Sequence, residues 1–121
     1  MDIIKFELQN KHSITIEETN ETSIISVSTI LYIDCNKGVT TVHTIDRNIN
    51  STFFLKEFER ILKNLGFIRV HHNTLINGRY ITKIRHSNGR VTVFLQNIEI
   101  SVSKRRIKTL KSVINEKPLI D

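Results

Sequence analysis

The chain has 121 residues, of which 39% are hydrophobic and 25% are charged. A chain of this size can bury a core without disulfides or a metal, and the composition is that of an ordinary globular protein, which argues against wholesale disorder. We therefore expect one domain over residues 1–121, with its core at about residues 12–115.

Several classes of protein are disfavoured at once. The lone Cys35 cannot form an internal disulfide, and one thiol among five scattered histidines does not supply the ligands of a structural zinc site. No window of about 18 apolar residues is present, and the N-terminus lacks the basic start, apolar run and cleavage site of a signal peptide. We expect a cytoplasmic protein without a membrane-spanning segment, a metal or a cofactor.

The basic charge is concentrated in the C-terminal half. Residues 1–65 carry seven Lys/Arg and nine Asp/Glu, a net charge of −2, whereas residues 66–121 carry eleven against three, a net charge of +8. This asymmetry suits a surface that meets a polyanion, either nucleic acid or an acidic membrane face. Charge alone also leaves open a basic face that is merely solvated.

Short runs of alternating or β-branched apolar residues predict ten strands. They are residues 4–8, 14–16, 24–27, 30–33, 39–45, 67–70, 74–76, 80–85, 91–95 and 98–102. Turn-forming residues separate the runs, among them Asn36-Lys37-Gly38. Ser87-Asn88-Gly89 is a strong hairpin signal, because Asn and Gly tolerate the positive φ of tight hairpin turns.

Two segments have helical periodicity instead. The apolar residues between Phe53 and Leu65 fall on one stripe, and Gly66 stands where a left-handed residue would end a helix. Its start can be capped by any of three polar residues, Asn50, Ser51 or Thr52.

The second helix is expected to begin near Ser103, a residue type that caps helices, and to end before Pro118. Its apolar face consists of Ile107, Leu110 and Ile114, and its opposite face of Lys104, Arg105 and Lys108. The pattern as a whole indicates a mostly β protein with one amphipathic helix in the middle and one basic helix at the end.

Three sequence blocks, in this order and spacing, carry a family resemblance. They are Ile30-Leu31-Tyr32-Ile33-Asp34, then Phe67 to Asn77 followed by Tyr80-Ile81 and Ile84, and finally Ile100-Ser101-Val102-Ser103-Lys104-Arg105. Together they resemble the LytTR-type DNA-binding domain, a family of bacterial transcriptional regulators, over about residues 12–115. Asn73 stands where that family usually has Ser.

The resemblance implies an elongated, multi-sheet β fold of about ten strands that binds duplex DNA with loops rather than with a recognition helix. Three loop regions along one edge would enter successive major grooves and cross the minor groove between them. Carried onto this sequence, the contact residues are Lys37 and Thr40, then His71, His72 and Asn73, and then Lys104 and Arg105, with Arg90 as a further basic position.

The chemistry of these residues suits such roles. Arg105 can pair with guanine O6 and N7, and Asn73 can donate and accept at an adenine edge. Lys37, Arg90 and Lys104 are better suited to phosphate, where a point charge displaces counterions. The N-terminus of the last helix adds unpaired N–H groups that favour a phosphate.

Four residues in the second block also have structural interpretations. Neighbours in a strand point to opposite faces, so His71 and His72 do not readily chelate one ion unless the chain turns there; we expect His71 to face inward and His72 outward. Asn77 fits a turn residue that binds local backbone better than it fits a base reader. Arg69, between two apolar residues, fits a partly buried structural cation.

No catalytic arrangement stands out. The sequence has no glycine-rich phosphate loop, nucleophile elbow or paired carboxylate motif, and Cys35 has no neighbouring signal for activation. We therefore expect no enzymatic activity. RNA or single-strand binding would require exposed aromatics, whereas most Phe and Tyr here occupy apparent core positions, and a membrane-surface role would require bulky aromatics on the last helix.

The expected function is sequence-specific binding of double-stranded DNA at promoter repeats, with a homodimer on the DNA. The alternative is a protein-interaction module that binds or sequesters a partner regulator. Members of the resembled family often carry a receiver domain or membrane helices before this module. We expect neither here, so that the chain is an excised domain or a standalone regulator.

Overall fold

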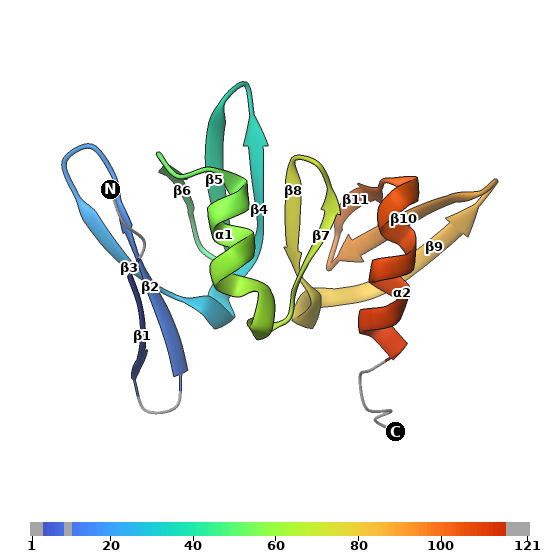
Figure 1. Cartoon of the computed structure of the whole chain (residues 1–121), viewed down its shortest axis with the longest axis horizontal. Helices are drawn as coiled ribbons and strands as arrows, with labels where there is room; N and C mark the ends of the chain where they lie inside the picture. The colour runs from blue at the N-terminus through green and yellow to red at the C-terminus, as the bar shows by residue number, and fades with distance from the viewer. Residues whose placement is uncertain (1–3, 9–10, 116–121) are drawn as a thin grey trace.

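The computed structural model describes residues 4–8 and 11–115, which form three antiparallel sheets in a row along the longest axis of the molecule (Figure 1). The N-terminal sheet has the order β1-β2-β3, with β1 (Ile4–Leu8), β2 (Lys11–Glu17) and β3 (Thr22–Ser26). The central sheet has the order β6-β5-β4-β8-β7, with β4 (Ile30–Asn36), β5 (Val39–Thr44), β6 (Asn48–Ser51), β7 (Phe67–His71) and β8 (Thr74–Asn77). The C-terminal sheet has the order β11-β10-β9, with β9 (Ile81–Ser87), β10 (Arg90–Leu95) and β11 (Ile98–Val102).

Two helices complete the fold. α1 (Leu55–Leu62) continues into a 3₁₀ turn at Lys63–Leu65, and α2 (Ile107–Asn115) follows a 3₁₀ turn at Lys104–Arg106. Within the described part of the chain, no helix has the length and apolar character needed to cross a membrane. The expected mostly β, elongated, multi-sheet fold with a middle and a C-terminal helix is confirmed.

The core has two halves, one on each face of the central sheet. The first half joins the N-terminal sheet, α1 and the central sheet, and its fully buried members include Ile16, Ile33 and Phe58. The second half joins the other face of the central sheet to the C-terminal sheet and α2, around Ile76 and Leu110. Successive side chains of a strand point to opposite faces of the sheet, so the central sheet contributes residues to both halves of the core.

α1 forms where the sequence predicts it, because its apolar stripe packs on the central sheet. Phe58 and Leu62 are fully buried. The chain leaves the helical region at Gly66, whose φ of +90° is the left-handed conformation that favours glycine. The predicted side-chain cap is wrong: the residue preceding the helix is Phe54, and no side chain caps it.

β6 is the strand that the sequence pattern does not reveal. It pairs with β5, and it contains Asn50 and Ser51, two of the three residues expected to cap the helix. Only one of its residues, Ile49, is strongly β-forming, so its strand conformation comes from pairing with β5 rather than from propensity.

Candidate nucleic-acid interface

The turn between β4 and β5 presents one predicted contact residue and buries another. Asn36 pairs with Val39 around Lys37 and Gly38, whose φ values of +52° and +80° fit a two-residue hairpin turn. Lys37 is therefore exposed at the tip. Thr40 does not lie as predicted, since its side chain is only 2% exposed and shares the inner face of β5 with Val42. Thr40 is therefore a buried residue of β5 and does not belong to the candidate interface.

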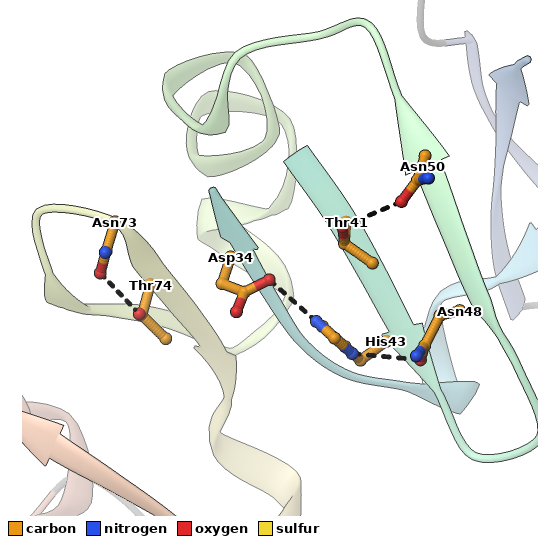
Figure 2. A network of polar contacts seen from close by, with 7 residues as sticks. All are labelled: Asp34, Thr41, His43, Asn48, Asn50, Asn73 and Thr74. Carbon is orange, nitrogen blue, oxygen red and sulfur yellow. Dashed lines mark hydrogen bonds and ion pairs between the residues drawn. The ribbon is translucent and has the colours of Figure 1, made fainter. Parts of the chain in front are cut away.

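The turn between β7 and β8 is built around Asn73. His71 pairs with Thr74, which leaves His72 and Asn73 as the turn residues. Asn73 Oδ1 lies 2.7 Å from His71 Nδ1 and accepts a hydrogen bond from Thr74 Oγ1 at 3.0 Å; Figure 2 shows the second contact. His71 is half-buried and His72 is exposed, as the sequence predicts.

The chain does turn at the two histidines, so their rings lie side by side, with centroids 4.4 Å apart, rather than on opposite faces. A metal site would need further ligands. Among the residues that the structure describes, no three His, Cys, Asp or Glu side chains gather closely enough to hold an ion.

Arg69 anchors the β7–β8 turn through hydrogen bonds. It is a structural cation, as its position between two apolar residues indicates. Its Nε donates to the carbonyl of His71 at 2.9 Å, and a terminal nitrogen donates to the carbonyl of His72. Its other terminal nitrogen pairs with Glu59 of α1 at 2.7 Å, and the side chain is only 15% exposed. Three N–H groups of the guanidinium, one on each nitrogen, are thus used inside the protein, so Arg69 positions the turn.

The start of the last helix lies against the same part of the molecule. Ser103 donates its backbone N–H to Val70 O at 2.9 Å, which fixes the entry to α2 beside β7. Lys104 and Arg105 are exposed there, as predicted, although Ser103 makes no side-chain cap. Burial lowers the pKa of Arg106, and the neighbouring positive charges of Arg69 and Arg105 lower it further, against an opposing effect of Glu59.

The hairpin of β9 and β10 carries Arg90. Asn88 and Gly89 have φ values of +53° and +76°, so the predicted tight turn is confirmed, and Arg90 is exposed beside it. Two further cations lie on this hairpin, with Lys83 Nζ and Arg85 Cζ 4.2 and 4.8 Å from the centroid of the Phe94 ring. The sequence pattern does not single out Lys83 or Arg85, because their shared contact with Phe94 depends on strand register.

These segments meet along one long edge of the molecule. In Figure 1 the β4–β5 turn, the β7–β8 turn and the start of α2 all point to the upper edge, and the β9–β10 hairpin projects beyond α2 at one end. A backbone hydrogen bond of 2.9 Å from Cys35 N–H to Asn73 O joins the first two segments. Ser103 joins the third to β7. The arrangement aligns exposed cations and an amide, which are the groups that contact phosphates and base edges.

A polar network lies across the β4–β5–β6 part of the central sheet (Figure 2). His43 Nε2 lies 2.8 Å from Asp34 Oδ1, and His43 Nδ1 lies 3.1 Å from Asn48 Oδ1. Tyr32 stacks on the His43 ring at 4.1 Å, and burial, followed by the charge of Asp34, raises the pKa of Tyr32. Sequence reasoning missed this network, because its members come from three different strands.

The network is not arranged for acid–base chemistry. An Asp–His pair activates a hydroxyl or thiol only when the second ring nitrogen can take a proton from it. Here the second nitrogen of His43 already contacts Asn48. The three side chains instead connect β4, β5 and β6 and so support the strands that carry Lys37.

The chain is similar in sequence to known regulatory proteins. The chain is 26% identical over 107 residues to the sensory transduction protein LytR of Staphylococcus epidermidis, and 27% identical over 104 residues to the transcriptional regulatory protein LytR of Staphylococcus aureus. These alignments cover 87% and 84% of this chain but 42% of each relative, so the chain spans about two-fifths of their length.

A solved LytTr DNA-binding domain from Bacillus cereus superposes with a TM-score of 0.75 at 20% identity, over 84% of this chain and 95% of that one, which shows a shared fold. The LytTr DNA-binding domain family also matches residues 20–115 directly. The chain therefore belongs to the LytTr DNA-binding domain family.

Proposed function

We propose that this chain binds duplex DNA sequence-specifically and so regulates transcription, with the upper edge of Figure 1 as its contact surface. The observation that carries the proposal is the alignment of Lys37, Asn73 and Arg105, from three separate segments, along one edge whose segments are tied by backbone hydrogen bonds. Family membership and the transcriptional role named for the S. aureus relative support it.

Within this edge the residues divide by chemistry. Lys37, Lys104 and, at the end of the molecule, Arg90 contact phosphates, because a flexible or peripheral cation displaces counterions without reading a base. Arg105 and Asn73 read base edges, and His72, exposed beside Asn73, contacts the same groove. His71 contributes through Asn73 rather than by direct contact.

We further propose that two copies occupy one DNA site. An elongated domain that presents three segments along one edge covers only a short stretch of duplex, and a promoter repeat would recruit a second copy. The stoichiometry of the complex on a selected duplex, measured by analytical ultracentrifugation, tests this: a single bound copy on a duplex that carries two repeats contradicts it.

The decisive experiment is selection of bound duplexes from a random pool. An enriched motif with repeated half-sites supports the proposal, and retention of random sequences at low salt without enrichment reduces the domain to a nonspecific binder. If no duplex binds at low salt, the proposal is wrong and the chain is better explained as a module that binds a partner regulator.

The salt dependence of DNA binding then tests whether the upper edge of Figure 1 is the contact surface. Lys104→Ala is expected to reduce the slope of log K against log salt by about one, because one counterion fewer is released. Lys63→Ala is the matched control, since Lys63 is equally exposed but belongs to the 3₁₀ turn Lys63–Leu65 that follows α1, and in Figure 1 that end of α1 points away from the upper edge. Equal effects of the two substitutions would contradict the assigned edge.

A further inference from the structure

We propose that Asn73 reads DNA only as a hydrogen-bond donor, because His71 and Thr74 hold its side-chain oxygen inside the protein. This inference rests on the proposed function and specifies it. His71 Nδ1 lies 2.7 Å from Asn73 Oδ1. Thr74 Oγ1 donates to the same oxygen at 3.0 Å, as Figure 2 shows.

The short contact requires one tautomer of His71. An amide oxygen can only accept, so with Oδ1 2.7 Å from the ring nitrogen we take His71 Nδ1 as the donor. The backbone N–H of Asn73 also approaches Nδ1, but at 3.5 Å, which is the limit of a hydrogen bond. Oδ1 thus receives two donors, which is the number that its two lone pairs can accept.

The backbone around Asn73 is fixed as well. Its carbonyl accepts the N–H of Cys35 at 2.9 Å. The guanidinium of Arg69 donates to the carbonyls of the two preceding residues, His71 and His72. With the side-chain oxygen and the main chain both anchored, rotation of the amide would break the contacts with His71 and Thr74.

What remains for DNA is the amide nitrogen. Among the described residues Nδ2 has no hydrogen-bond partner, and Asn73 lies half-exposed in the turn at the contact edge. Two N–H donors match guanine, which offers N7 and O6 as acceptors in the major groove. They match adenine less well, since the adenine N6 amino group is itself a donor. The adenine-edge pairing that the sequence suggests requires Oδ1 to accept, and that oxygen is occupied.

His71 and Thr74 are then positioning residues for base choice. Thr74→Val keeps the shape of the side chain but removes one of the two donors to Oδ1, so the amide can turn and present its oxygen. Thr74→Ser keeps the hydroxyl and serves as the conservative rescue. A purely structural role for Thr74 would change affinity for all duplexes alike, whereas this inference predicts a change in which base is preferred.

The central comparison is made between duplexes that differ in one base, with the unaltered protein, so that folding of a variant does not enter it; the variants locate the base pair and test the role of Thr74. Selection with the wild type and with Asn73→Ala first identifies the base pair whose preference Asn73 sets. At that position, replacing guanine by 7-deazaguanine keeps Watson–Crick pairing but removes the N7 acceptor, and binding is expected to fall about tenfold. Replacing guanine by adenine at the same position is expected to lower the affinity by a similar factor. Thr74→Val is expected to bring the affinities for guanine and adenine closer together, whereas Thr74→Ser is not.

The outcomes separate the two proposals. If wild type selects adenine there, and removal of the N6 amino group weakens binding, the amide oxygen faces the DNA and this inference is overturned while the proposed function stands. Identical base preferences for wild type and Asn73→Ala also overturn it. If the wild type binds no duplex, the proposed function fails and takes this inference with it.

Discussion

Arg69 and Glu59 form an ion pair of 2.7 Å that joins the β7–β8 turn to the side of α1. The same guanidinium holds two carbonyls of the turn, so a helix that packs on the sheet also determines where the tip of the turn lies. The packing of α1 is thereby connected to the position of Asn73, although no residue of α1 belongs to the contact edge.

Arg69→Ala is expected to lower the free energy of unfolding by about 1–3 kcal/mol, because it removes a mostly buried side chain and leaves two carbonyls of the turn and the Glu59 carboxylate without their donor. Urea denaturation measures this. Arg60→Ala is the matched control, since Arg60 also pairs with a glutamate of α1 but its side chain is 72% exposed, and its removal should change stability by less than about 0.5 kcal/mol. Equal losses would mean that Arg69 does not stabilise the turn.

Asn77→Ala is expected to destabilise the fold by about 1–3 kcal/mol without a specific effect on DNA binding. Asn77 is 3% exposed; its Nδ2 donates to Ile30 O at 2.9 Å, and its Oδ1 accepts from Arg79 N–H at 3.1 Å. Asn64→Ala, at an exposed site, is the control in the same denaturation series. Loss of base preference with unchanged stability would instead make Asn77 a DNA reader.

Arg105→Ala is expected to weaken binding to a selected duplex by about 1–3 kcal/mol and to weaken binding to random duplex much less, because a guanidinium paired with guanine contributes mainly to discrimination. Titration of labelled duplexes at one fixed salt concentration gives both affinities. Lys104→Ala is the comparison, with similar losses expected on both duplexes. If Arg105→Ala weakens binding to the selected and the random duplex equally, Arg105 is a phosphate contact.

Tyr32→Phe is expected to make stability less sensitive to alkaline pH. Burial, and then Asp34, raise the pKa of Tyr32 in the folded state, so the folded protein holds this proton more tightly than the unfolded chain does. The resulting stabilisation is complete below the ordinary tyrosine pKa of about 10 and is lost as the pH rises through the folded-state pKa. Urea denaturation between about pH 8 and 11 should show a steeper decline for the wild type than for Tyr32→Phe. Parallel curves would contradict this.

Local patterns predicted the parts of the fold that depend on neighbours in sequence. The hairpin at Asn88-Gly89, the end of the helical segment at Gly66 and the structural role of Arg69 each follow from residue type and spacing, and each is confirmed. The family resemblance, confirmed by the match over residues 20–115, supplied what local patterns cannot, namely which loops share an edge.

The errors arose where pairing decides the outcome. Asn50 and Ser51 have the side chains of helix caps, but pairing with β5 makes them a strand. Thr40 lies two residues past the tip of a turn, and the register of that hairpin turns its side chain inward. The contacts of Asn73 with His71 and Thr74 could not be predicted either, because residue types alone do not show which side chains of a turn will contact the Asn73 oxygen.

β7 is an outer strand of the central sheet, and such a strand exposes backbone groups that can pair with another molecule. Here the entry to α2 covers it, with Ser103 N–H bonded to Val70 O and Leu110 buried behind. The segment that carries Lys104 and Arg105 therefore also shields the protein from strand-by-strand self-association. A chain cut after Val102 would lose Lys104 and Arg105 and, at the same step, the segment that covers the edge of β7.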